Sequence, residues 1–271
     1  NLTGSNAITG TLTINANATL DADNTNNYNL TAAAITIAAS GTYTARTSTI
    51  TLSGSFSNSG TFTAGASTLT LNGTTDQTIT TNSQAFYNLT LNNTGASGSD
   101  DIIISGALDI DNILTITDGD LDLNTNNPNM TLAGNLSIAS AGSVTKGSGT
   151  WTFDGSGSST WSDSSSAIQD LGAVTINGSS KTISTSTNVK AASITIGADD
   201  TLNITDDTLT LTGTGTVLTL TSGGTFTITS STVIYTGTTT ATTIGAVNYN
   251  NLTLTPTAAT TYSLGGNLTG S

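Results

Sequence analysis

The sequence lacks several residue types on which most catalytic sites depend. Its 271 residues include no Cys and no His, and all 17 acidic residues are Asp, so Glu is also absent. Thiol nucleophiles, imidazole bases and Cys/His metal sites are therefore excluded, and disulfides cannot indicate a redox compartment. These absences favour a structural or binding role, and we expect that the protein is not an enzyme.

Basic residues are scarce. Only Arg46, Lys146, Lys181 and Lys190 are present, they are widely spaced, and the net charge is −13. Phosphate binding and attraction to anionic lipids both need clustered Lys and Arg, so we expect no nucleic-acid partner. No apolar run reaches the length of about 18 residues that spans a bilayer, so we expect no membrane insertion. Because no basic-then-apolar leader opens the chain at Asn1, we expect a mature or excerpted segment.

Proline is also rare, with two residues, yet the chain has the regular apolar spacing that disordered segments lack. Leu, Ile or Phe alternates with Thr at period two, which is the pattern of β-strands with one buried face. Thr, Asn and Gly disfavour helices throughout. The alternation predicts an all-β fold and is clearest in "TLTIN" (11–15), "STITLSG" (48–54), "STLTLNG" (67–73), "DTLTLTG" (207–213) and "GTFTITS" (224–230).

The spacing of the strands favours a parallel β-helix, or β-solenoid, with about three short strands per coil. Apolar positions recur after short turns, and aromatic core anchors of the kind found in β-sandwiches are few. At roughly 20 residues per coil, the chain would form about 13 coils. Tandem β-sandwich domains are the alternative.

Three blocks share one order of strands and turns and place Leu89, Val174 and Leu252 at matching positions. They divide residues 1–271 into three divergent units of one continuous solenoid, approximately 1–105, 106–189 and 190–271. The pentapeptide "NLTGS" occurs at residues 1–5 and again at 267–271. We therefore expect the chain to be one period of a longer repeat array.

A family resemblance follows from the cassette "GTFTAGASTLTLNGTTDQTI" leading to "FYNLTLNNTG" (60–95). It resembles repeats of very large bacterial cell-surface proteins. More loosely, the chain is similar to the β-helical shafts of filamentous-haemagglutinin-type adhesins and autotransporter passengers. The resemblance implies an extracellular or cell-surface location and a structural or adhesive fibre.

The segment "ALDIDNILTITDGDLDLN" (107–124) is rich in Asp. Alternate Asp side chains share one face of a strand, and stacked carboxylates repel one another unless a cation bridges them. The calcium loops with definite signatures are absent, so a solvated acidic face is the alternative to a calcium site. The metal-ligand candidates are Asp109, Asp111, Asp118, Asp120 and Asp122.

Other patterns point to binding. Thr-x-Thr motifs such as Thr68/Thr70 suggest an ice-binding face, but Thr is common on outer strand faces, and we expect Asp, Ser and Asn to interrupt the column. Asn-x-Ser/Thr sequons such as that at Asn88 would accept glycans. Asp pairs on a β-helix also suit glycosidases, but the turns here are short. We expect Trp151 and Trp161 to fill the core.

The sequence as a whole predicts the structural shaft of an extracellular surface fibre or giant adhesin. The expected partners are other copies of the same repeat, end to end or laterally in a fibre, together with surface glycans. Because both ends of the segment should expose unpaired strand edges, we expect it to stack end to end or aggregate. A module that binds calcium, glycans or ice on a β-solenoid is the alternative function.

Overall fold

The fold is a parallel β-solenoid, seen in a computed structural model that describes residues 1–237, 241–267 and 269–270. The described residues contain strands and turns but no helix, and they form about 11 turns in all. The prediction of an all-β solenoid is confirmed, and the β-sandwich alternative is wrong because the strands pair in parallel, coil on coil.

The number of coils is smaller than the 13 predicted, because the coils vary in length. Thr68 and Asn88 occupy equivalent positions on successive coils and are 20 residues apart. Asp76 and Asp101 are also one coil apart, yet 25 residues separate them. Extra residues enter at the turns, so no single coil length holds.

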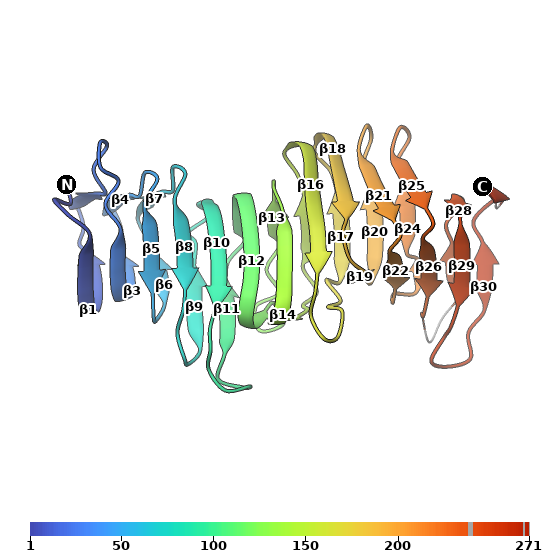
Figure 1. The fold of residues 1–271 in the computed structure, drawn as a ribbon, viewed down its shortest axis with the longest axis horizontal. Helices are drawn as coiled ribbons and strands as arrows, with labels where there is room; N and C mark the ends of the chain where they lie inside the picture. Colours follow the sequence, from blue (N-terminus) through green and yellow to red (C-terminus); the bar gives the residue numbers. More distant parts are fainter. Residues whose placement is uncertain (238–240, 268, 271) are drawn as a thin grey trace. The chain divides into compact units, whose positions relative to one another are not determined.

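The chain folds as two compact units. Unit 1 comprises residues 1–131 and 138–147, and unit 2 comprises residues 132–137 and 148–271. The first twelve strands belong to unit 1 (Figure 1): β1 (Asn6–Ile14), β2 (Thr19–Asp21), β3 (Leu30–Ile37), β4 (Thr42–Thr44), β5 (Thr49–Leu52), β6 (Phe56–Asn58), β7 (Thr61–Thr63), β8 (Thr68–Leu71), β9 (Gln77–Thr80), β10 (Phe86–Asn92), β11 (Asp101–Ser105) and β12 (Leu108–Asp122).

Strands β13 (Met130–Leu132) and β14 (Leu136–Thr145) contain residues of both units. The remaining strands belong to unit 2: β15 (Thr150–Phe153), β16 (Ser156–Asp163), β17 (Ala173–Ile176), β18 (Ser179–Thr185), β19 (Val189–Ala191), β20 (Ser193–Ile196), β21 (Thr201–Thr205), β22 (Thr208–Leu211), β23 (Gly215–Thr216), β24 (Leu218–Leu220), β25 (Thr225–Thr229), β26 (Thr232–Tyr235), β27 (Thr242–Ile244), β28 (Asn248–Tyr249), β29 (Asn251–Leu254), β30 (Tyr262–Leu264) and β31 (Thr269–Gly270).

Unit 1 arranges its strands in three stacks, one for each face of the coil. The first stack begins with 6–8 of β1. Its next five strands, called here the threonine sheet, are 30–32 of β3, 49–52 of β5, 68–71 of β8, 88–91 of β10 and 113–116 of β12. The second contains the other half of β3 with β6, β9, β11 and the end of β12. The third contains β2, β4 and β7. Figure 1 shows the strands of the threonine sheet side by side.

The apolar residues of the period-two pattern form the core, because every coil directs the same side of its strands inward. In β8, Leu69 and Leu71 are buried, while the Thr residues between them face outward. In-register pairing then stacks residues of one kind from coil to coil. The central aliphatic column of unit 1, with exposures of 1% or less, consists of Leu30, Ile50, Leu69, Leu89 and Leu114.

Aromatic side chains add to the core. In unit 1, Phe56 packs edge-on against Phe62 and Phe86, with ring centroids 5.1 and 5.3 Å apart. In unit 2, Trp151 and Trp161 are buried, which confirms the core role predicted for them. The scarcity of aromatics in the sequence therefore reflects a slim core, not an absence of aromatic packing.

The corners reuse a left-handed backbone conformation. Arg46 has φ of 63°, and Gly65, at the equivalent corner of the next coil, has φ of 61°. The Arg46 carbonyl accepts the Ala66 N–H at 2.6 Å, so the two corners are joined directly. A Cβ on Gly65 would lie 2.3 Å from this carbonyl oxygen, and only glycine fits there.

Unit 2 stacks its strands in the same way, but the matching segments of the sequence fall on different sheets. Val174 lies on β17 in the stack β15–β17–β20–β24. Leu252 lies on β29 in a separate sheet, β19–β22–β26–β29. The distance along the chain between these two blocks is therefore not a whole number of coils.

We predict that Leu69→Ala lowers the free energy of unfolding by about 2–5 kcal/mol, because it opens a cavity in the middle of the aliphatic column. Urea denaturation followed by far-UV circular dichroism measures the change. Leu264→Ala is the control, since Leu264 is 61% exposed, and it should change stability by less than about 0.5 kcal/mol. Equal effects of the two substitutions would contradict the packing described here.

Candidate functional site

The five Asp residues predicted as metal ligands all lie on β12, which turns a corner of the coil. Asp109 and Asp111 lie on its first part, where Ile110 pairs with β10. Asp120 and Asp122 lie on its last part, which pairs with β11. Among the residues that the structure describes, no three carboxylates come close enough together to hold a metal ion. The run in the sequence is thus divided between two faces.

Asp122 has a structural role that accounts for its position. Its side chain is 8% exposed and accepts the backbone N–H groups of Asn124 and Thr125 at 2.7 and 3.0 Å. It also accepts the Thr125 hydroxyl. These bonds close the turn that follows β12. Asp118 bonds in a similar way to the N–H of Gly119, and Asp120 accepts the Ser143 hydroxyl at 3.0 Å.

The structure forms an acidic column that the sequence did not reveal. Asp101 pairs with Asp120, and the register of β9 with β11 places Asp76 beside Asp101 on the other side. The Asp101 N–H donates to the Asp76 carboxylate at 3.3 Å. Burial raises the pKa of the Asp101 carboxyl, and the neighbouring Asp120, Asp76 and Asp122 carboxylates add to this effect. The sequence did not predict this column, because its three residues come from separate segments of the chain.

The pKa shift of Asp101 predicts a pH-dependent stability. A carboxyl whose pKa is raised by folding destabilises the folded state when ionised, and this cost disappears as the pH falls through the folded pKa. We expect Asp101→Asn to raise the free energy of unfolding at pH 7 by up to about 1 kcal/mol. The gain should vanish below about pH 4, where Asp is protonated in both states.

Thermal unfolding of the two proteins from pH 3 to pH 8 measures this effect. Asp111→Asn is the matched control, because Asp111 is exposed on the first part of β12. A gain from Asp101→Asn that is the same at every pH would show that repulsion within the acidic column is not its cause.

Unit 2 contains a buried cationic side chain. Lys181 is fully buried on β18, and its Nζ donates to the Ser159 hydroxyl at 2.7 Å and to the Ala133 carbonyl. Its backbone N–H donates to Asp200 at 2.8 Å. Burial lowers the pKa of Lys181, whereas the Asp154 and Asp200 carboxylates oppose the shift. Because the Lys181 Nζ is buried and donates to Ser159 and Ala133, this part of unit 2 does not have the open geometry of a catalytic site.

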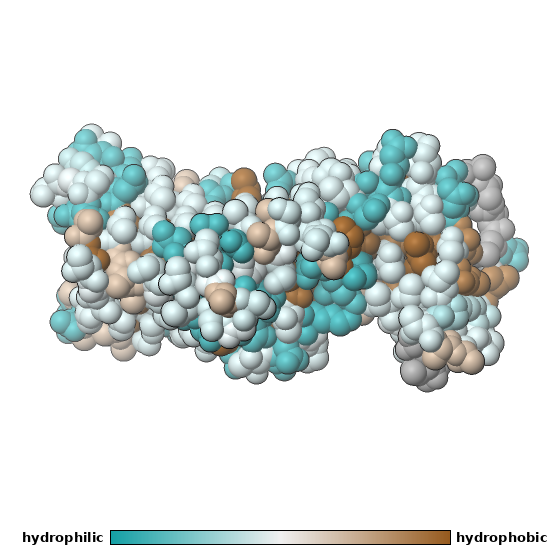
Figure 2. Space-filling model, turned by 60° about the horizontal axis from the view of Figure 1, so that its bottom comes forward, coloured by the Kyte–Doolittle hydropathy of each residue, from teal (hydrophilic) through white to brown (hydrophobic). Residues whose placement is uncertain are grey.

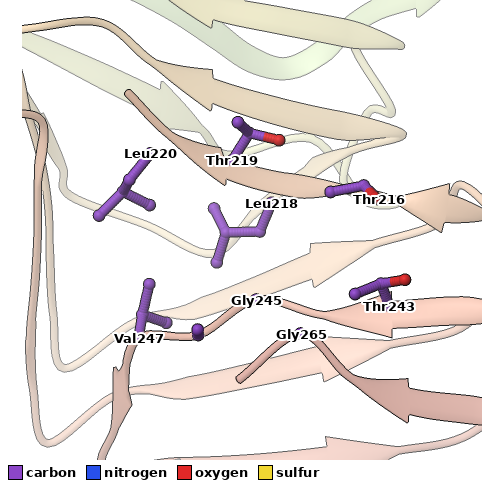
Figure 3. Close-up of a pocket in the computed structure, with 9 residues that line it drawn as sticks. Thr216, Leu218, Thr219, Leu220, Thr243, Gly245, Val247 and Gly265 are labelled. Carbon is purple, nitrogen blue, oxygen red and sulfur yellow. The ribbon is translucent and has the colours of Figure 1, made fainter. Parts of the chain in front are cut away.

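A groove of about 360 Å³ lies beside β24 in unit 2. Figure 3 shows Val247 pointing toward Leu218 and Leu220, with Gly245 and Gly265 below them. In the described chain, β24 pairs with β20 on one side only. Hydrophobic surface gathers over the C-terminal coils of this unit (Figure 2). The groove therefore lies between β24 and the following coil, and a Cβ on Gly245 of that coil would be 3.2 Å from the Leu218 carbonyl oxygen.

Comparisons with protein-family models, with curated proteins and with solved structures find no match to this chain. No helix in the described part of the chain is long and apolar enough to cross a membrane. The geometry of the solenoid itself must therefore support any functional conclusion.

Proposed function

We propose that the chain is a structural shaft module of an extracellular or cell-surface fibre, as in giant bacterial adhesins. The observation that carries this proposal is the in-register stacking of parallel coils, in which the aliphatic column and the backbone ladder run from one coil to the next. In such a stack each coil contacts only its neighbours, so stability extends along the axis for as long as coils are added.

The last strand of the stack β19–β22–β26–β29 supports a role for other copies of the chain as partners, because in the described chain β29 pairs only with β26. An unpaired parallel strand presents N–H and C=O groups to which a further strand can add. Leu254 on β29 and Leu264 on β30 are 41% and 61% exposed, and a further coil supplied by a second copy would bury them.

One pair of substitutions tests the contact between copies. Thr253 and Thr232 are both partly exposed, but Thr253 is on β29, the last strand of its stack, and Thr232 is on β26, which is paired on both sides. A lysine at a strand edge opposes strand addition. We expect the unmodified chain to form end-to-end oligomers with rising concentration, Thr253→Lys to shift them toward monomer, and Thr232→Lys to leave them unchanged.

Analytical ultracentrifugation measures the association, and negative-stain electron microscopy shows whether the oligomers are linear. A chain that stays monomeric at every concentration would count against stacking through this edge. Compact, non-linear oligomers would count against the shaft itself.

A further inference from the structure

An unbroken ladder of Thr side chains runs along the outer face of the threonine sheet. The register places Thr31 beside Thr51, Thr51 beside Thr70, Thr70 beside Thr90, and Thr90 beside Thr115. The ladder ends at Thr31, because β1 places Ala7 beside it. Interruptions by Asn, Ser or Asp, which the sequence led us to expect, fall in the neighbouring rows. The expectation of a broken column is therefore wrong for this face.

The hydroxyl groups of this ladder have no hydrogen-bond partner within the described part of the chain. The adjacent row behaves differently: the Asn88 amide donates to the Thr68 hydroxyl at 3.2 Å, and Asn112 donates to Asn88 at 2.8 Å. Amide ladders thus stabilise the adjacent row from coil to coil, while the Thr ladder leaves its donors and acceptors directed outward. Thr31 is exposed, and the other four are partly exposed.

Charge is absent from this part of the face although the protein carries a net charge of −13. The rows on either side of the ladder are uncharged from β3 to β10, with Asn29, Thr49, Thr68 and Asn88 on one side and Ala33, Ser53, Asn72 and Asn92 on the other. The first charge is Asp118, which lies beside Asn92 on β12. A neutral face is unsuited to ionic minerals and polyelectrolytes. These rows also contain no aromatic ring on which a sugar could stack.

The array is regular and stiff. Neighbouring strands of a sheet are about 4.8 Å apart, and the two Thr of one Thr-x-Thr motif are about 6.6 Å apart. Thr is β-branched and has few rotamers, so each methyl and hydroxyl is held in place. Five strands by five residues cover roughly 400 Å². Two such faces together fall short of the 1,200 Å² or so that a stable protein–protein contact buries.

We propose that the threonine sheet is an ice-binding face. Its partner must be uncharged, must accept and donate hydrogen bonds at every site, and must repeat at nearly the strand spacing over an extended surface. Crystalline water has these properties, since its oxygen rows repeat at a similar spacing and each oxygen both donates and accepts. The hydroxyls would occupy lattice positions while the methyl groups between them exclude liquid water.

Partition of the full chain between slowly growing polycrystalline ice and the remaining liquid tests the proposal. We expect enrichment in the ice of at least severalfold over a protein of similar size that does not bind ice, together with inhibition of ice recrystallisation. Thr70→Tyr, at the centre of the ladder, should reduce the enrichment to that of the non-binding protein. Asn203→Tyr should retain it, because Asn203 lies between Ser184 and Thr227 in a column of unit 2 that is not a Thr ladder.

Tyr suits strands as well as Thr does, so both variants should fold, and far-UV circular dichroism checks this. Thr70→Val provides a second test, because it keeps the shape and one methyl but removes the hydroxyl, and it should weaken the enrichment. Exclusion of the unmodified chain from ice, or full enrichment of Thr70→Tyr, would overturn the proposal.

Two other results would also overturn it: binding to crystalline polysaccharide in place of ice, or lateral self-association that Thr70→Tyr abolishes. The experiment is independent of the shaft proposal, because neither Thr253 nor β29 belongs to the threonine sheet.

Discussion

Parallel pairing between successive coils is the constraint on which this structure depends. A coil has too few strands to satisfy its own backbone N–H and C=O groups, so these groups must pair with the coils above and below. Pairing in register brings equivalent positions together, such as Leu69 beside Leu89 and Thr70 beside Thr90. Each position must therefore suit a copy of itself about 4.8 Å away. The narrow composition of the sequence follows from this requirement, since Leu, Ile, Thr and Asn stack well on themselves.

Charged residues do not stack well, which explains where the Asp residues are found. Many lie at corners, where a carboxylate accepts backbone N–H groups that the turn leaves free. Asp23 does so with Thr25 and Asn26, and Asp163 does so with Ser165 and Gln169. Such bonds stabilise the turn without bringing two carboxylates together. The column through Asp101 departs from this rule, and there burial, together with the neighbouring carboxylates, raises the pKa of Asp101.

The sequence predicted the parts of the fold that depend on local alternation. Period two identified the strands, their buried faces and the solenoid class, because each strand shows its two faces within four or five residues. Coil length was not predictable in this way, because extra residues in a turn change no strand pattern. The coil from Asp76 to Asp101 contains such an insertion, and its 25 residues make the estimate of 13 coils too high.

Local alternation also could not predict which Asp residues lie close together in space. Asp109 and Asp122 look like members of one acidic run, but β12 bends around a corner between them and places them in different stacks. Asp76, Asp101 and Asp120 are scattered in the sequence and become neighbours only once the register is known. The Thr ladder also becomes visible only in the register, since Thr31, Thr51, Thr70 and Thr90 are 19 or 20 residues apart but Thr115 follows Thr90 by 25.

The repeat in the sequence and the repeat in the structure have different periods, and this difference bears on function. Matching blocks place Val174 and Leu252 on different sheets of unit 2, so a residue type repeated in the sequence moves from one face of the coil to another. A binding site that needs one face along the whole array would be broken at each such step. Stacking of the coils is not affected by this change of face, because the strands of every face pair in parallel. The "TLTL" or "NLTL" pattern suits a strand on any face. A face such as the threonine sheet can therefore serve as a local site within one unit, while the property that all the repeats share is the capacity to continue the stack.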